Sequence, residues 1–330
     1  MTIAWSVLVL FSLLMYVVLD GYDLGIGIAS LFERDAGHRH AMLEEVTVAW
    51  DGNETWLVLA GVSLWAGFPL AFGTILPHAY LVLIVVLLSL IVRGVSVEMV
   101  SQNRHARGWE RAFGVASLIA ALAQGAALAT LTQNLRILDG AFAGSAFGSL
   151  SWFALLTAAT VACLYVTMGY AYLKLKATGT LRAIAGRRGS VVGLLSAVLI
   201  AASFGAVNAT AAPLNLHSPS RAIGFAGLIL FAIAGLVLTV VTIRPASTLD
   251  TLPVAGLVTT TAALLLAVVV ARAPVIVPPS LTVEGAASPS TTMTFLMVGV
   301  GLNVPLLLFY NWFAKHAFRG RTANLIAEGE

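Results

Sequence analysis

The chain has 330 residues, of which 59% are hydrophobic and only 10% are charged, and its formal net charge is +3. Ordinary soluble domains carry roughly 25% charged residues. A chain this apolar is therefore expected to present most of its surface to membrane lipid. Its basic residues are spread over several loops and form no single face, which argues against a nucleic-acid partner.

Nine apolar runs follow one another along the chain. A membrane span needs about 20 mainly apolar residues, and lipid offers no partners for unpaired backbone groups, so each run is expected to be a helix. Residues 1–330 are expected to form a single transmembrane domain, because no polar stretch is long enough for a separate soluble one. The runs cover residues 3–30, 50–72, 77–98, 113–133, 152–173, 191–208, 223–243, 253–271 and 293–314.

Lysine and arginine are unevenly divided between the two sets of connections. The odd-numbered loops and the C-terminal tail hold 15 of the 18 basic residues, whereas the even-numbered loops hold Arg136, Arg221 and Arg272. Basic loops stay on the cytoplasmic side of a membrane. The division predicts an N-terminus outside and a C-terminus in the cytoplasm.

Three consecutive runs bring ionisable residues to a similar depth near the predicted cytoplasmic side. A carboxylate inside a bilayer costs about 2.5 kcal/mol or more unless it is paired, protonated or hydrated, so these positions call for an explanation. They are Asp20 and Asp23 late in the first run, Asp51 and Glu54 at the start of the second, and Arg93 and Glu98 at the end of the third.

Two interpretations of the second run's acids stay open. Asp51 and Glu54 are three residues apart and so project from one helix face. Carboxylates are favoured in the first turn of a helix by its free N–H groups and dipole, which accounts for Asp51 but less well for Glu54, nearly a turn deeper. The alternative is a role in proton conduction.

Arg93 is the obvious buried counter-charge for Asp20 or Asp23. A structural ion pair is the simplest interpretation, and removing one partner of a buried pair strands the other charge. In the first run, Gly21, Gly25 and Gly27 would allow another helix to approach closely.

The histidines fall in loops or at the ends of the runs, and the single cysteine, Cys163, lies inside one. Haem in a helical bundle needs axial ligands such as histidine or methionine projecting inward, and a copper site needs clustered imidazoles. The chain is therefore expected to hold no metal or redox centre by itself, and no catalytic residue is assigned.

The polar segments together resemble subunit II of cytochrome bd-type quinol oxidases, the family that includes the cyanide-insensitive ubiquinol oxidases. The resemblance runs nearly the full length of the chain. The matching segments are DGYDLGIG (20–27), WDGNETWL (50–57), RGVSVE (93–98), GYAYLKLKATGTL (169–181), PPSLTVEGAAS (278–288) and LFYNWFAKHAFRG (308–320).

This resemblance implies a non-haem subunit of a respiratory terminal oxidase in the prokaryotic cytoplasmic membrane. The implied partner is a homologous subunit I that carries haems b558, b595 and d, in a complex that oxidises quinol and reduces dioxygen to water. The implied fold is two four-helix bundles plus one peripheral helix. The resemblance leaves open which quinone is used, and whether a structural quinone or a small accessory membrane subunit is also bound.

The resemblance also implies roles for the polar residues. Asp51 belongs to a proton path from the cytoplasm toward haem d, with Glu54 as the expected second member. Trp56, with its neighbours Trp50 and Asn53, lies near a dioxygen route along the subunit interface. Four residues are expected to support haem d assembly or to take part in the buried ion pair: Asp20, Asp23, Arg93 and Glu98.

Two other functions compete with this one. A secondary transporter or ion channel with an inner-side carboxylate site is the first, although the later runs contain neither broken helices nor mid-span acids. A purely structural scaffold for subunit I is the second.

Overall fold

The computed structural model describes residues 1–102, 107–132, 137–138, 141–142, 144–145, 150–210 and 214–317. Among these residues nine helices are long, and two short ones lie in the connections. The long helices are α1 (Thr2–Ser30), α3 (Trp50–Gly67), α4 (Pro69–Gln102), α5 (Arg107–Thr132), α6 (Trp152–Lys176), α7 (Gly179–Thr210), α8 (Pro219–Thr242), α9 (Leu252–Arg272) and α11 (Ser290–Ala317). The short helices are α2 (Ala36–Thr47) and α10 (Val283–Ala286), and the small antiparallel sheets pair β1 (Ile137–Leu138) with β2 (Ala141–Phe142) and β3 (Val275–Val277) with β4 (Leu281–Thr282).

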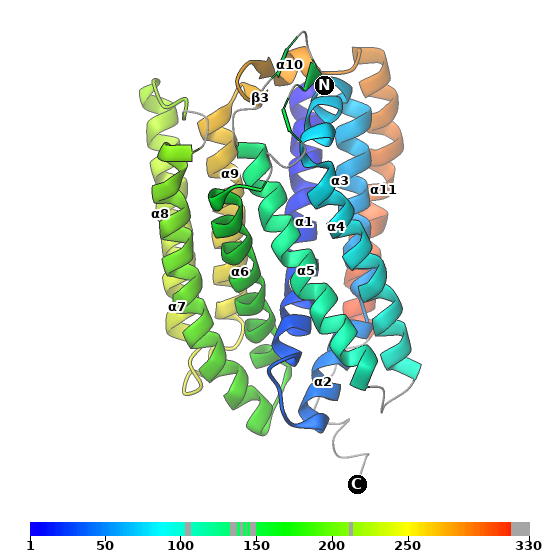
Figure 1. The fold of residues 1–330 in the computed structure, drawn as a ribbon, viewed down its shortest axis with the longest axis vertical. Coiled ribbons are helices and arrows are strands. Elements are labelled where there is room, and N and C mark those ends of the chain that lie inside the picture. The colour runs from blue at the N-terminus through cyan, green and yellow to red at the C-terminus, as the bar shows by residue number, and fades with distance from the viewer. Residues whose placement is uncertain are drawn as a thin grey trace.

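The long helices lie side by side in two groups of four (Figure 1). In the first bundle, α1 and α4 each contact both α3 and α5. In the second, α6 and α8 each contact both α7 and α9. The bundles join where α6 packs against α1 and α5, while α11 lies outside against α3 and α1. The expectation of two four-helix bundles with one peripheral helix is confirmed.

Eight of the long helices in the described part of the chain are apolar and long enough to cross a membrane, which confirms a polytopic all-α membrane protein. The other long helix, α3, has 18 residues, or about 27 Å at 1.5 Å per residue. Its first turns are polar, since they contain Asp51 and Glu54. It contacts both α1 and α4 inside the first bundle, and we treat it as the ninth span.

The predicted second span, 50–72, is divided in the structure. α3 ends at Gly67, and α4 begins at Pro69, eight residues before the predicted third span. Phe68 between them has φ −133° and ψ 62°, because a residue that precedes proline is pushed out of the helical region. The last carbonyls of α3 then accept hydrogen bonds from Ser288, at 2.7 Å from its Oγ and 2.9 Å from its N.

The longer α4 also changes the depth of two predicted residues. His78, expected at a span end, lies in the third turn of α4 and is buried. Arg93, expected in the last turn, lies nine residues before Gln102, or about 14 Å from the end of the helix. α1 continues for ten residues beyond Asp20, as the predicted run 3–30 did. Of the ionisable residues of the first bundle, Arg93 is therefore the one that lies farther from its helix end than the sequence predicted.

The connection between α1 and α3 contains a helix that the sequence analysis did not predict. α2 begins after Asp35, whose Oδ1 accepts a hydrogen bond from the backbone N–H of His38 at 2.7 Å. α2 marks the end of the molecule at which α4, α6 and α8 also finish (Figure 1). The basic loops belong to this end, so the predicted cytoplasmic side corresponds to it, and the orientation itself stays a prediction.

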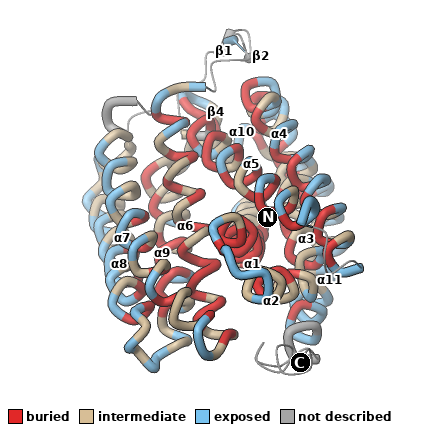
Figure 2. The backbone as a smooth tube through the Cα atoms, turned by 60° about the horizontal axis from the view of Figure 1, so that its bottom comes forward, coloured by how far each residue is buried: buried red, intermediate tan, exposed pale blue. Residues whose placement is uncertain are grey.

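α1 is the central helix, and its buried residues lie in the middle of the molecule (Figure 2). Glycine residues on α1 let a neighbouring helix approach its backbone closely, as the sequence predicted. A Cβ atom on Gly25 would overlap the carbonyl oxygen of Tyr165 on α6, and one on Gly169 would overlap the backbone of Gly25. The backbones of α1 and α6 are thus in direct contact, which holds the two bundles together.

The second bundle is fastened at the α2 end by an ion-pair cluster on Asp250, in the loop between α8 and α9. Arg182 of α7 binds this carboxylate through Nη2 at 2.7 Å and Nε at 3.2 Å, and the buried Lys174 of α6 approaches it at 3.4 Å. Lys174 also donates to the carbonyl of Thr242 at 2.6 Å. Partial burial alone would raise the pKa of Asp250, but the hydrogen bonds and charges of Arg182 and Lys174 outweigh it and hold that pKa below its usual value.

Replacing Gly25 by alanine should separate α1 from α6. The added methyl has no space against the Tyr165 backbone, so we expect the free energy of unfolding to fall by about 1–3 kcal/mol or more. Thermal unfolding in detergent, followed by circular dichroism, measures this change. Gly73→Ala is the control, since a Cβ at Gly73 meets nothing within 4 Å and alanine favours the helix. Equal midpoints for the two variants would contradict the close approach.

The Asp250 cluster predicts a pH-dependent stability. Because the pKa of Asp250 is lower in the folded than in the unfolded chain, its contribution is complete above the unfolded value of about 3.9 and is lost as the pH falls through the folded one. Between pH 6 and pH 3 the wild type should therefore lose more unfolding free energy than Asp250→Asn. Thermal unfolding at both pH values measures the difference, with Glu98→Gln as a charge-matched control. An equal loss of unfolding free energy in the wild type and in Asp250→Asn would contradict a stabilising role for the Asp250 ion pairs.

Candidate functional site

A buried guanidinium on α4 connects three helices of the first bundle. The Arg93 side chain is fully buried, and its Nη1 lies 2.6 Å from Oδ1 of Asp20 on α1. Its Nη2 lies 2.8 Å from Oε1 of Glu54 on α3. The Asp20 side chain is also fully buried, whereas that of Glu54 is 22% exposed. Of the two acids that the sequence offered as partners for Arg93, the structure selects Asp20 and adds Glu54.

The other acid of α1 is held by an amide. Asn53 of α3 donates from Nδ2 to Oδ2 of Asp23 at 2.7 Å, and the same nitrogen lies 3.2 Å from the Tyr22 hydroxyl and 3.4 Å from the Leu19 carbonyl. Both Asn53 and Asp23 are buried. Asn53 therefore joins α3 to α1 one helical turn away from the Arg93 contacts, and the predicted residues of α1 and α3 come together.

Asp51 lies at the surface in the first turn of α3. The residue before the helix, Ala49, makes no side-chain cap. The negative charge of Asp51 in the first turn therefore interacts favourably with the free N–H groups at this helix end. Its neighbour Trp50 is half-buried and packs over Gly94, next to Arg93 on α4. Asp51 and Glu54 thus stand at successive depths, from the surface to the buried guanidinium.

Trp56 lies fully inside the first bundle. Its ring packs edge-on against Phe11 of α1, with centroids 5.7 Å apart and planes at 87°. Its Nε1 is buried and has no hydrogen-bond acceptor among the described residues. Trp56 therefore faces an apolar region between α1 and α3.

Glu98 lies apart from the Arg93 group. It is exposed near the end of α4, five residues beyond Arg93, and accepts a hydrogen bond from Gln102 at 3.0 Å. This contact is local to one helix, so Glu98 makes none of the links between helices described above.

Comparison with known proteins supplies the family. The family model described as cytochrome bd terminal oxidase subunit II matches residues 1–318. This chain belongs to that family. The arrangement of the WDGNE segment of α3 against α1 and α4 is therefore the arrangement found in a cytochrome bd subunit II chain.

Individual relatives match a shorter part of this chain than the family model does. Cytochrome bd-I ubiquinol oxidase subunit 2 of Escherichia coli (strain K12) is 28% identical over 206 residues, which are 60% of this chain and 54% of that protein. Cytochrome bd ubiquinol oxidase subunit 2 of Bacillus subtilis (strain 168) is 27% identical over 186 residues, 54% of each. The chain thus spans about half the length of the curated relatives it matches.

A solved structure shares the fold. It is titled "The structure of bd oxidase from Geobacillus thermodenitrificans", and one of its chains superimposes with a TM-score of 0.69 at 17% sequence identity. The match covers 94% of this chain and 98% of that one. At this identity the likeness concerns the fold.

The structure adds polar residues to the subunit II site that the sequence analysis missed. Gln124 of α5 donates from Nε2 to the Tyr16 hydroxyl at 2.7 Å, and its Oε1 accepts from the Tyr165 hydroxyl at 2.9 Å. Tyr16 lies one turn before Asp20 on α1. The signal was present in the sequence, since Tyr16 and Asp20 share a helix face at i, i+4 and Gln124 is an amide in the middle of an apolar run.

Removing Arg93 should destabilise the first bundle strongly. Arg93→Met would leave Asp20 charged and buried, and we expect the free energy of unfolding to fall by about 3–5 kcal/mol. Adding Asp20→Asn should restore part of this loss, because the stranded charge is then gone. Thermal unfolding of Arg93→Met, Asp20→Asn and the double variant measures the coupling. The exposed Arg187→Met is the control, expected within about 0.5 kcal/mol of the wild type, and strictly additive effects at positions 20 and 93 would contradict the pair.

Proposed function

We propose that this chain is the non-haem subunit of a respiratory terminal oxidase, assembled with a haem-bearing subunit I that oxidises quinol and reduces dioxygen to water. Membership of the subunit II family over residues 1–318 supports this proposal. Haems b558, b595 and d are assigned to subunit I. Among the residues described for this chain, no three or more histidine, cysteine, aspartate or glutamate side chains are grouped to hold a metal ion.

We further propose that the inner-side carboxylates take up protons for the partner. The supporting observation is a series of acids at increasing depth: Asp51 is exposed, Glu54 is partly exposed, and Asp20 is fully buried. Carboxylates bind and pass protons in many enzymes. Asp20 and Glu54 share one guanidinium, so the group carries one spare negative charge when both are ionised, and one added proton neutralises it.

The direction of proton uptake follows from the predicted orientation. Reducing one dioxygen to two waters consumes four protons. If these enter from the α2 end while quinol releases its own on the opposite side, charge is separated without a pump. Each charge moved against 100 mV stores about 2.3 kcal/mol.

The other site residues receive supporting roles in this proposal. Trp56, with Trp50 and Asn53, is assigned to the dioxygen route, because the apolar region around Trp56 suits an apolar gas. Arg93 and Asp20 are assigned to assembly, since the contacts of Arg93 with Asp20 and Glu54 set the packing of α1, α3 and α4 that a partner would meet. Asp23 and Glu98 keep this predicted role, the first through its bond to Asn53.

A pure scaffold is the second candidate, favoured by the full burial and double pairing of Arg93. It predicts that the acids matter for assembly only. A transporter or channel subunit would instead be stable and active without any haem-bearing companion. Both alternatives are separated from proton uptake by measuring turnover and haem content together.

Asp51→Asn and Glu54→Gln should each slow oxygen consumption by the purified complex at least several-fold, because each removes one proton-binding group. The visible haem spectrum should be unchanged in Asp51→Asn, since this side chain lies at the surface. Oxygen-electrode rates per haem d measure the effect. Glu44→Gln, at the same end on α2, is the matched carboxylate control.

Two results would count against the proposal. Normal turnover in both variants at full haem content would leave only the scaffold role. A stable chain that transports a solute after purification without a haem protein would remove the oxidase assignment itself.

A further inference from the structure

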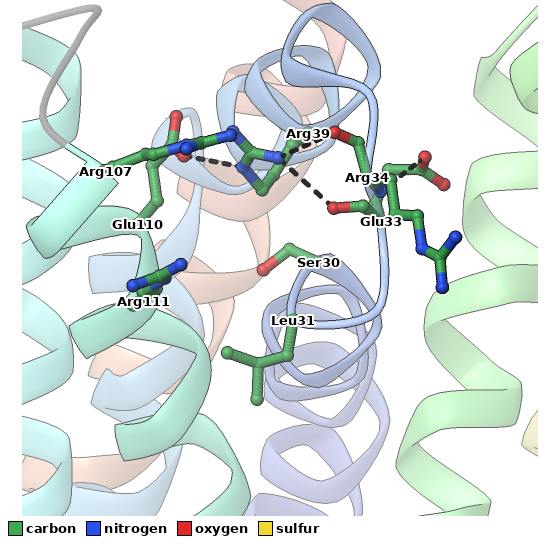
Figure 3. Close-up of a pocket in the computed structure, with 8 residues that line it drawn as sticks. All are labelled: Ser30, Leu31, Glu33, Arg34, Arg39, Arg107, Glu110 and Arg111. Carbon is green, nitrogen blue, oxygen red and sulfur yellow. Dashed lines mark hydrogen bonds and ion pairs between the residues drawn. The ribbon is translucent and has the colours of Figure 1, made fainter.

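A pocket of about 300 Å³ opens at the α2 end of the first bundle (Figure 3), and none of Asp20, Glu54 and Arg93 lines it. The end of α1, the start of α2 and the start of α5 contribute to it. Its charged lining consists of two glutamates and four arginines: Glu33, Glu110, Arg34, Arg39, Arg107 and Arg111.

The two acids of the pocket are already neutralised. Glu110 is bound by Arg39 at 2.6 Å, and Glu33 is bound by Arg188 of α7 at 3.0 Å. Backbone N–H groups of residues 34 and 35 also donate to Glu33, at 2.9 and 3.1 Å. Glu33 and Glu110 are buried, so these pairs form a fixed rim on one wall of the pocket.

The remaining cations have no acid to bind. Arg34, Arg107 and Arg111 are exposed and make no ion pair with any residue that the structure describes. Arg107 and Arg111 extend from α5 on one side of the pocket, and Arg34 lies on the loop after α1 on the other (Figure 3). The pocket therefore presents three guanidinium groups without a carboxylate partner among the described residues, which suits a phosphate group, because guanidinium donors match its oxygens in pairs.

A separate apolar groove lies farther along α5. It has a volume of about 360 Å³ and lies between α4 and α5, where Leu88 and Val92 face Val115 and Ile119. Arg107, Arg111, Val115 and Ile119 recur every four residues, so each lies next to the following one on the surface of α5. Each step is about 6 Å, so the basic positions pass directly into the apolar ones.

The exposed aromatic side chains beside the pocket agree with a position at the depth of lipid headgroups. Phe32 is 66% exposed and Trp109 is 40% exposed, and they stand beside the arginines on the α1 loop and on α5. Tryptophan concentrates at membrane–water interfaces. Basic pockets between helices at this depth bind anionic lipid headgroups in membrane proteins.

We propose that the pocket and the groove together bind one anionic phospholipid. Arg107 and Arg111 hold its phosphate, Arg34 adds charge from the opposite wall, and an acyl chain lies along the α4–α5 groove. A free phosphate would use the arginines but not the groove, and a neutral quinone would use the groove but not the arginines. Only a lipid with a charged headgroup uses both.

Native mass spectrometry of the full chain, purified in detergent with the subunits that accompany it, tests this site. The probes are phosphatidylglycerol, phosphatidylcholine and inorganic phosphate. Phosphatidylglycerol should bind in preference to phosphatidylcholine, and Arg107→Gln/Arg111→Gln should weaken its binding by about tenfold or more. Arg187→Gln/Arg244→Gln removes the same charge from exposed positions at the same end and should leave binding unchanged.

A second pair of variants tests the groove. Val115→Phe fills it and should weaken phosphatidylglycerol binding, whereas Val198→Phe, on an exposed face of α7, should not. Helical content and unfolding midpoint are checked for every variant. Equal lipid binding in the Arg107/Arg111 variant and its control would overturn the headgroup site. Two other results would overturn the lipid assignment. One is that inorganic phosphate competes for the site equally well in the wild type and in Val115→Phe, and the other is that a quinone is bound in place of phospholipid.

Discussion

The burial of the Arg93 guanidinium is the constraint on which the first bundle depends. A charged arginine inside a membrane is tolerated only with partners, and no neighbour on α4 supplies one. Asp20 of α1 and Glu54 of α3 must therefore both reach it, at 2.6 and 2.8 Å. This requirement fixes the height and rotation of α1 and α3 relative to α4, and the contact between Gly25 and α6 then places the second bundle against the first.

One turn of α3 meets three environments because helical residues point in different directions every 100°. Asp51 faces the surface, Asn53 faces Asp23 on α1, and Glu54 reaches Arg93 on α4. Helix capping alone therefore does not account for both acids of this segment, and neither does buried ion pairing alone. The same short stretch anchors the bundle and presents a carboxylate at its surface, so a structural role and a proton-conducting role are compatible within it.

The sequence predicted what depends on composition and missed what depends on geometry. Apolar run lengths identified the spans, and the lone Arg93 identified a buried pair, but the choice between Asp20 and Asp23 depends on helix rotation, which no pattern encodes. The end of α3 at Gly67 was missed because the apolar run continues past the break at Phe68, although Pro69 marked the boundary. Tyr16 and Gln124 were missed because their hydrogen bond joins α1 to α5, far apart in sequence.

The two bundles treat their buried cations in opposite ways. In the second, Asp250 is shared by Lys174 and Arg182, and Lys174 also binds a backbone carbonyl, so this cluster has spare positive charge. In the first, Arg93 is shared by two carboxylates, and one of them is partly exposed. Spare negative charge attracts protons, whereas spare positive charge repels them. Of these two clusters, the one on Arg93 therefore has the sign of charge that the proposed proton uptake needs, and the one on Asp250 links α6 and α7 to the loop between α8 and α9.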